Sequence, residues 1–448
     1  MVALEIPQPI QDYRLCRLMT WSKSHPTWMS GERSEMGTES PLRICQIHWP
    51  VVILLAAVPM TNSEGREDPL VGKKVTVIKW DAEFRSESNK VIGTSELGKN
   101  YEVYTVKGNK LYVRECDGYL LRSDIVPYDT AMNHFTSIVK RKLSANAYYD
   151  RGAAWEARDE IDEALKDYNE ALRKNPKFAE VYNARANIHS LKGDYDKAIQ
   201  DYDKSLQLGP GDSTVLCNRG MIYAAKGDLD RALQDYDKAL ETNSQYQPAY
   251  RERAEIWQKK SQLDKAVADY DMALKLNESD QRSRLNRGFL RSLQNDEDGA
   301  IADFNELIKR EPQHARGLHL RGLTWIKKGV YTTAAADLSL ALEANPMDFD
   351  IHVGLALIRV ASPEDSVRNS AEAMELLAKA KELGNWKNSY QYQATLAAAH
   401  AELGEFDKAL EVEESLSPRV PDALKAEHEA RLKLYRDRKP FRLVPPKK

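Results

Sequence analysis

The chain has 448 residues, of which 42% are hydrophobic and 30% are charged, and its formal net charge is −3. This composition predicts a folded protein, excludes a largely disordered chain and provides no global positive field for nucleic acid. The four cysteines, Cys16, Cys45, Cys116 and Cys217, are too few and too scattered for a disulfide framework or a zinc site.

Residues 1–63 form an N-terminal extension with one targeting signal. An apolar run at residues 51–58 follows Arg43 and precedes a polar stretch, as in a signal peptide. The run is shorter than the roughly 20 residues of a membrane span, and a start at Met36 would give a signal of ordinary length. We therefore expect export to the periplasm or cell envelope. An uncleaved membrane anchor and a cytoplasmic protein are the alternatives.

Residues 68–128 change to the two-residue period of short strands. Runs such as KKVTVIKW and NYEVYTVKGNKLYVREC alternate apolar and polar residues, and KGN indicates a hairpin turn. The order of these runs resembles a bacterial SH3-like domain, which implies a small all-β barrel. Such a barrel would either bind cell-wall material or cover the end of the helices that follow.

Residues 129–143 predict a connecting helix. Met132, Phe135, Val139 and Leu143 recur at intervals of three and four residues, which places them on one helix face. We expect this face to cover the first helical repeat.

A 34-residue repeat follows in six aligned copies, from residue 144 to residue 346. Each copy has a small residue, an alanine twelve positions later and a large residue four positions beyond it. The small residue lets two helices approach closely, and the large residue fills the space beyond the alanine. The small residues are Gly152, Ala186, Gly220, Ala254, Gly288 and Gly322, and the large ones are Tyr168, Tyr202, Tyr236, Tyr270, Phe304 and Leu338.

An arginine precedes each small residue, and an aspartate stands sixteen positions after each arginine. Six pairs at one offset predict an ion pair between packed helices, either within a repeat or across to its neighbour. Since a binding residue need not recur six times, we interpret the pairs as structural. They are Arg151–Asp167, Arg185–Asp201, Arg219–Asp235, Arg253–Asp269, Arg287–Asp303 and Arg321–Asp337.

The repeat resembles the tetratricopeptide repeat, a helix–turn–helix unit of 34 residues. Two weaker units follow, one with an insertion of about five residues before Ala373 and one with Gly404 and Ala409, so we expect about eight repeats over residues 144–421. Residues 422–448 predict a capping helix and a basic tail, which a repeat array needs over its last open face. The expected fold class is mainly α, a superhelix of repeats preceded by the small all-β barrel.

The resemblance implies a concave groove for partner peptides, lined by positions two, five and nine of each repeat. Two asparagines stand beside the paired arginines in the sequence NRG, as in repeats that clamp carboxylate-ended peptides. The groove residues are Asn183, Asn187, Arg251, Arg282, Arg316 and His319, and the two asparagines are Asn218 and Asn286.

The fifth repeat carries additional arginines in its first helix. Arg284 and Arg291 lie seven residues apart and therefore on one face. With Arg251, Arg282 and Arg316 they suggest a basic middle of the groove, suited to acidic peptides or carboxylates. The alternative is a degenerate repeat in which the arginine stems pack and the charged ends reach water.

The sequence contains none of the common catalytic, nucleotide-binding or metal-binding motifs. We therefore expect a non-enzymatic adaptor without a cofactor, which binds proteins or peptides and no nucleic acid. Membrane contact is expected only if the N-terminal segment is retained. The alternative is an exported cell-envelope protein whose SH3-like domain binds wall material.

Overall fold

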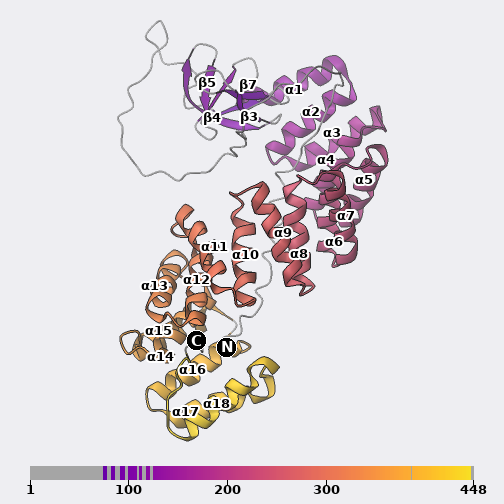
Figure 1. Cartoon of the computed structure of the whole chain (residues 1–448). Helices are drawn as coiled ribbons and strands as arrows, with labels where there is room; N and C mark the ends of the chain where they lie inside the picture. Colours follow the sequence, from indigo (N-terminus) through magenta and orange to yellow (C-terminus); the bar gives the residue numbers. More distant parts are fainter. Residues whose placement is uncertain are drawn as a thin grey trace, which may run out of the picture. The chain divides into compact units, whose positions relative to one another are not determined.

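The computed structural model describes residues 74–77, 82–85, 91–95, 99–107, 110–113, 118–121, 125–384 and 386–444 (Figure 1). The signal-like segment lies outside these residues, so the structure does not test the export prediction. The chain divides into two compact units, which meet in sequence between Thr242 and Asn243. We call them the N-terminal unit and the C-terminal unit and describe each by itself.

The N-terminal unit begins with short antiparallel strands in the order β3-β2-β6-β5-β4-β1-β7. Val103, Leu111 and Leu120 form the centre of their apolar core. A barrel requires the two end strands to pair, whereas β3 and β7 are the open ends of the described sheet. The closed SH3-like barrel that we expected is therefore not shown. The strands are β1 (Lys74–Val77), β2 (Ala82–Arg85), β3 (Val91–Ser95), β4 (Asn100–Lys107), β5 (Lys110–Val113), β6 (Gly118–Leu121) and β7 (Ile125–Pro127).

Helix α1 (Tyr128–Lys142) follows the sheet and buries Ala131, Phe135 and Val139. Phe135 contacts Ala154 of the next helix, as expected for a helix that covers the first repeat. The prediction that Leu143 belongs to this face is wrong. Leu143 caps the helix in the left-handed conformation, with φ of 45°, and its side chain is 54% exposed.

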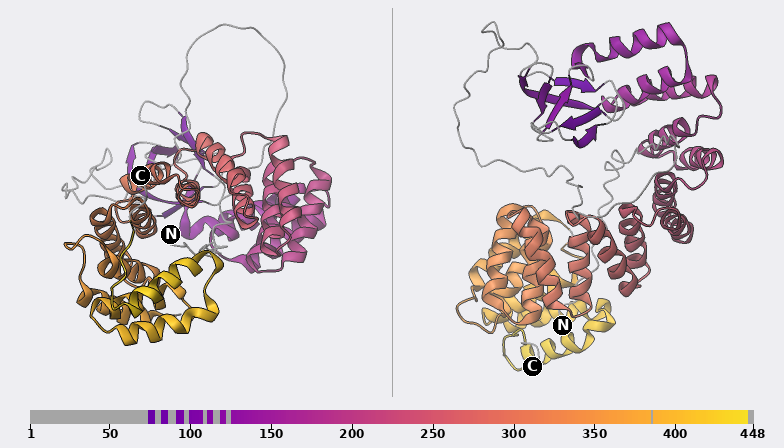
Figure 2. Two further views of the ribbon diagram at one scale, coloured as in Figure 1. Left: turned by 60° about the horizontal axis from the view of Figure 1, so that its bottom comes forward. Right: turned by 45° about the horizontal axis from the view of Figure 1, so that its top comes forward.

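Three helix pairs complete the N-terminal unit, and in each pair the two helices pack side by side (Figure 2). The turns between paired helices use positive-φ glycines such as Gly193 and Gly227, because an L side chain is strained in that conformation. The pairs are α2 (Ala145–Ala157) with α3 (Ile161–Lys174), α4 (Ala179–Leu191) with α5 (Tyr195–Leu208), and α6 (Ser213–Ala225) with α7 (Leu229–Thr242).

The C-terminal unit continues the same arrangement and ends with a single helix, α18 (Lys425–Arg436), against α17. The insertion predicted in the seventh repeat is the loop 362–369 between α14 and α15. The pairs are α8 (Gln247–Lys259) with α9 (Leu263–Leu276), α10 (Gln281–Leu293) with α11 (Glu297–Arg310), α12 (Ala315–Lys328) with α13 (Tyr331–Ala344), α14 (Phe349–Ala361) with α15 (Ser370–Leu383), and α16 (Tyr390–Glu402) with α17 (Phe406–Leu416). The short 3-10 helices η4 (Ser417–Arg419) and η5 (Asp422–Leu424) precede α18.

The small-and-large pattern of the sequence produces the close approach within each pair. A Cβ atom added at Gly220 would lie 2.7 Å from a ring carbon of Tyr236. At Gly288 the corresponding distance to the ring of Phe304 is 2.8 Å. Tyr236 and Phe304 are at most 1% exposed. The predicted packing is therefore confirmed at these positions.

The six arginine–aspartate pairs form as bidentate ion pairs within each repeat. In repeat three, Nε and Nη2 of Arg219 donate to the two carboxylate oxygens of Asp235 at 2.9 and 2.6 Å. The third guanidinium nitrogen of Arg219 donates to Asp203, on the second helix of the preceding repeat, at 2.5 Å. Arg287 and Asp271 repeat this contact at 2.6 Å. Each arginine of this kind therefore joins two helices of one repeat to the repeat before it.

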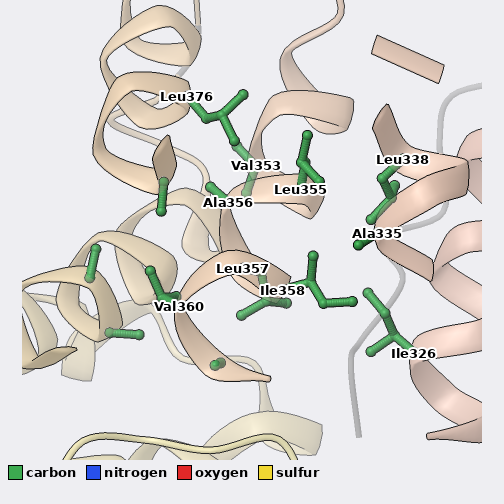
Figure 3. Close-up of a cluster of buried hydrophobic side chains, with 14 of the residues drawn as sticks. Ile326, Ala335, Leu338, Val353, Leu355, Ala356, Leu357, Ile358, Val360 and Leu376 are labelled. Atoms are coloured by element: carbon green, nitrogen blue, oxygen red, sulfur yellow. The ribbon is translucent and has the colours of Figure 1, made fainter. Parts of the chain in front are cut away.

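Repeats seven and eight contain leucine and valine where the first six repeats contain these ion pairs. Leu355 precedes the small residue Ala356, and Leu376 takes the place of the aspartate (Figure 3). Both leucines belong to one buried apolar cluster of the C-terminal unit. At these two positions α14 is therefore joined to α15 by apolar packing, while Arg359 of α14 pairs with Glu372 of α15 elsewhere, at 3.0 Å.

Candidate functional site

We use the term groove face for positions two, five and nine of the first helix in each repeat. In the N-terminal unit, Asn183 and Asn187 lie on this face of the second repeat, and Asn218, at position six of the third repeat, lies beside Asn187. Asn187 Oδ1 accepts a hydrogen bond from Tyr202 Oη at 2.6 Å and another from Asn218 Nδ2 at 3.3 Å. Asn183, one turn before Asn187 on α4, has a buried Oδ1 atom without a hydrogen-bond partner among the described residues. The three predicted asparagines are thus neighbours on α4 and α6.

In the C-terminal unit, Arg251 and Arg282 lie within a group of carboxylates. Arg251 lies 3.0 Å from Glu252 and 3.5 Å from Asp280, measured between nitrogen and carboxylate oxygen. Arg282 donates to Glu255 at 2.7 Å and to Glu252 at 3.4 Å. Two guanidinium groups therefore face three carboxylates. The basic groove centre that the sequence suggested is neutralised by its own neighbours.

Glu255 occupies position nine of the fourth repeat and has an unusual acidity. Burial, with repulsion from the nearby Glu252 carboxylate, raises its pKa to about 7, although Arg282 and Arg251 oppose the shift. Near neutral pH, a change of one proton at Glu255 alters the charge of the whole group. The sequence analysis did not single out Glu252, Glu255 or Asp280. The signal for Glu252 and Glu255 was the alternation of charge around Arg251 in the run YRERAE, whereas Asp280 lies outside this run.

Arg284 and Arg291 belong to the interior of the fifth repeat. Both lie close to Asp303, the aspartate that forms the ion pair of this repeat with Arg287. Arg291 lies 3.0 Å from Asp303, and Arg284 donates to the backbone oxygen of Glu278 at 2.7 Å. The shared face predicted for the two arginines is thus directed at a buried carboxylate.

Asn286 and the pair Arg316 and His319 complete the predicted set. Asn286 Nδ2 donates to the hydroxyl of Tyr270 at 3.1 Å. Arg316 and His319 are half-buried and lie one turn apart on α12. Burial lowers the pKa of both, that of His319 to about 4, while the charge of Asp348 opposes each shift. His319 is therefore neutral at physiological pH.

The part of the chain that the structure describes has neither a metal-binding cluster nor a membrane-spanning helix. There, no group of three or more histidine, cysteine, aspartate or glutamate side chains could hold a metal ion. Within the same residues, no helix has both the length and the apolar character needed to cross a bilayer.

Two models of the tetratricopeptide repeat family match this chain. One matches residues 153–213 and 293–349, and the other matches residues 213–246. No curated protein matches the chain. The matched residues cover parts of the helix pairs described above, which confirms tetratricopeptide repeats in this protein. This fold points to a protein–protein interaction scaffold.

The chain is also similar to solved repeat proteins. It is 24% identical to YrrB, described as a TPR protein with an unusual peptide-binding site, over 42% of this chain and 96% of that one, with a TM-score of 0.38. It is 22% identical to a tetratricopeptide repeat protein from Parabacteroides merdae, over 54% and 94% of the two chains, with a TM-score of 0.42. For PilF of Pseudomonas aeruginosa the identity is 19%, the coverage 47% and 96%, and the TM-score 0.43. The presence of tetratricopeptide repeats in this chain rests on the family models and on the helix packing.

Proposed function

We propose that this protein is a non-enzymatic scaffold that binds partner peptides on the groove face of its repeats. The observation that carries the proposal is the amide row of α4 and α6, formed by Asn183, Asn187 and Asn218. Its counterpart in the C-terminal unit is a group of charges that already pair with one another.

Amide side chains suit a peptide backbone because each offers both a carbonyl acceptor and N–H donors, the two kinds of group that a peptide unit presents. In the part of the chain that the structure describes, the buried oxygen of Asn183 has no partner, and a buried acceptor left unpaired costs free energy. A backbone N–H of a bound peptide would supply the missing donor. Asn187, by contrast, is held in place by Tyr202 and Asn218, so the row is partly fixed before a peptide binds.

A phage-displayed library of random octapeptides tests the proposal with the full-length protein as bait. We expect Asn183→Ala and Asn218→Ala to weaken the binding of selected peptides by about tenfold each, the effect of losing one net hydrogen bond. Gln207→Ala is the matched control, because it removes an exposed amide from the second helix of the same repeat. Failure to select peptides, or equal affinity in all variants, would contradict the proposal.

Export and contact with cell-wall material remain proposals of a second kind. They depend on the apolar run at residues 51–58 and on the strands at residues 74–127. Mass spectrometry of the N-terminus of protein purified from its own cells tests export: a start between residues 61 and 67 supports it. Residue 1 or 36 in a soluble cytoplasmic fraction would remove the wall-binding alternative. An acidic partner is not favoured, because the carboxylates around Arg251 and Arg282 outnumber these arginines.

A further inference from the structure

The C-terminal end of the described chain folds back onto the last two repeats. We call residues 439–444 the strap. The backbone N–H of Leu443 donates to the carbonyl of Ala361, the last residue of α14, at 2.7 Å. Its side chain is 9% exposed and belongs to the apolar cluster around α14. The Arg442 guanidinium donates to both carboxylate oxygens of Glu402, the last residue of α16, at 2.6 and 3.1 Å.

The strap lies beside the groove face of repeats seven and eight. Counted from the first residues of α14 and α16, Leu357 is at position nine, and Gln391 and Ala394 are at positions two and five. These three residues line a small pocket together with Phe441 and Leu443 of the strap. The chain's own end therefore occupies the surface on which the repeats would receive a peptide.

We propose that the strap is a displaceable internal ligand of this groove face, and that the face binds external peptides with the same pattern of an aromatic residue, an arginine and an aliphatic residue. The inference rests on the proposed function, because it names the ligand class for one part of the groove face. It concerns different repeats from the asparagine row.

The contacts of Glu402 favour displacement. Arg368, from the loop 362–369, also pairs with Glu402, at 3.2 Å. When the strap leaves, the carboxylate keeps this partner, so no buried charge is left alone. Arg442 is partly exposed already, and Val444 is 82% exposed. Arg368 in the insertion of the seventh repeat thus keeps the Glu402 carboxylate paired and able to accept an arginine of an external peptide.

The remaining wall of the pocket is held in place independently of the strap. Arg431 of α18 pairs with the buried Glu413 at 2.9 Å and with Glu427 at 2.6 Å. Its guanidinium lies 5.7 Å from the centre of the Phe441 ring, which is within cation–π range. An aromatic side chain of an external peptide could take the place of Phe441 without any change in the ion pairs of Arg431.

The test uses the full chain and the strap sequence as a probe. A fluorescein-labelled peptide of residues 439–444, KPFRLV, is titrated by fluorescence anisotropy into wild type and into Arg442→Glu/Leu443→Asp. We expect the double variant to bind at least about tenfold more tightly, because the tethered strap competes in wild type at a millimolar effective concentration. Glu402→Gln added to the variant should abolish this gain, whereas Asn183→Ala should leave it unchanged.

Equal binding by the two proteins, or no binding by a double variant with a native circular dichroism spectrum, would overturn the proposal. If the double variant does not fold, hydrogen exchange of the wild type decides. A displaceable strap requires the Leu443 amide to exchange by local opening, faster than the amides of α14. Exchange of Leu443 only with global unfolding would show a fixed structural element. Since the probe is the chain's own segment, a failed octapeptide selection does not affect this result.

Discussion

Repeats one to six and repeats seven and eight have the same pairwise helix packing but carry different residues at the two positions of the arginine–aspartate pair. In the first six, an arginine and an aspartate form a bidentate ion pair, and each aspartate is at most 7% exposed. In the seventh, Leu355 and Leu376 occupy the same two positions in an apolar cluster. The comparison teaches that the ion pair is one of two solutions to the same packing problem. Apolar residues of similar volume can replace a buried ion pair without loss of stability.

The largest effect is expected at Asp303, where three arginines converge. Asp303→Ala leaves Arg284, Arg287 and Arg291 without their shared carboxylate. Breaking a buried ion pair on one side costs about 3–5 kcal/mol, so we expect at least this loss in the free energy of unfolding, measured by urea denaturation. The control is Asp298→Ala on the same helix, whose exposed pair with Lys328 predicts a loss of about 0–1 kcal/mol. Equal losses in the two variants would show that the arginine–aspartate pair contributes no more stability than an exposed ion pair.

A direct exchange between the two kinds of repeat sharpens the comparison. Asp337→Leu alone should destabilise the sixth repeat by about 3–5 kcal/mol, because Arg321 then lacks its partner. Asp337→Leu combined with Arg321→Leu should recover most of this loss, because it recreates the leucine pair of the seventh repeat. Thermal and urea denaturation of wild type, single and double variants measure the recovery. A double variant as unstable as the single one would mean that the ion pair itself, and not the filled space, holds the helices.

Two groove-face residues of the C-terminal unit should respond to pH in opposite directions. The pKa of Glu255 is raised from 4.5 to about 7, so the folded state binds more protons than the unfolded state between these values. Stability from this group therefore falls as pH rises from about 4.5 to about 7. The pKa of His319 is lowered from 6.5 to about 4, and its contribution is lost as pH falls through that range.

Glu255→Gln and His319→Gln separate the two contributions. Relative to wild type, Glu255→Gln should gain stability as pH rises towards 7, and His319→Gln should gain as pH falls towards 4. Urea midpoints measured at half-unit intervals from pH 4 to pH 8 give both differences. A constant difference from wild type across the range would contradict the assigned burial of either group.

The smallest effect is expected at the surface pairs between neighbouring repeats. Lys226 pairs with Asp196, which is 82% exposed, and Lys192 pairs with Asp162 in the same way thirty residues apart. Exposed pairs contribute about 0–1 kcal/mol and are screened by salt. Asp196→Ala should therefore lower stability slightly in dilute buffer and not at all in 1 M sodium chloride. A loss that persists in high salt would show that this pair behaves like the buried arginine–aspartate pairs.

The sequence by itself determined the repeat, its six ion pairs and the close contacts of small with large residues. These features depend on spacings of four to sixteen residues within one helix pair, and such spacings recur visibly along the chain. Its resemblance to the repeat family also assigned Asn183, Asn187 and Asn218 to the groove, although the three occupy different repeat positions.

Only the tertiary structure decided which charged groups remain available to a partner and where residues 439–444 fold. Arg282 is neutralised by Glu252 and Glu255, about thirty residues away, and Arg442 reaches Glu402 across forty. Neither contact follows the repeat period, so no pattern in the sequence announces it. The open order of the described strands was likewise beyond prediction, since closure depends on whether the two end strands pair in space and not on the alternation within each strand.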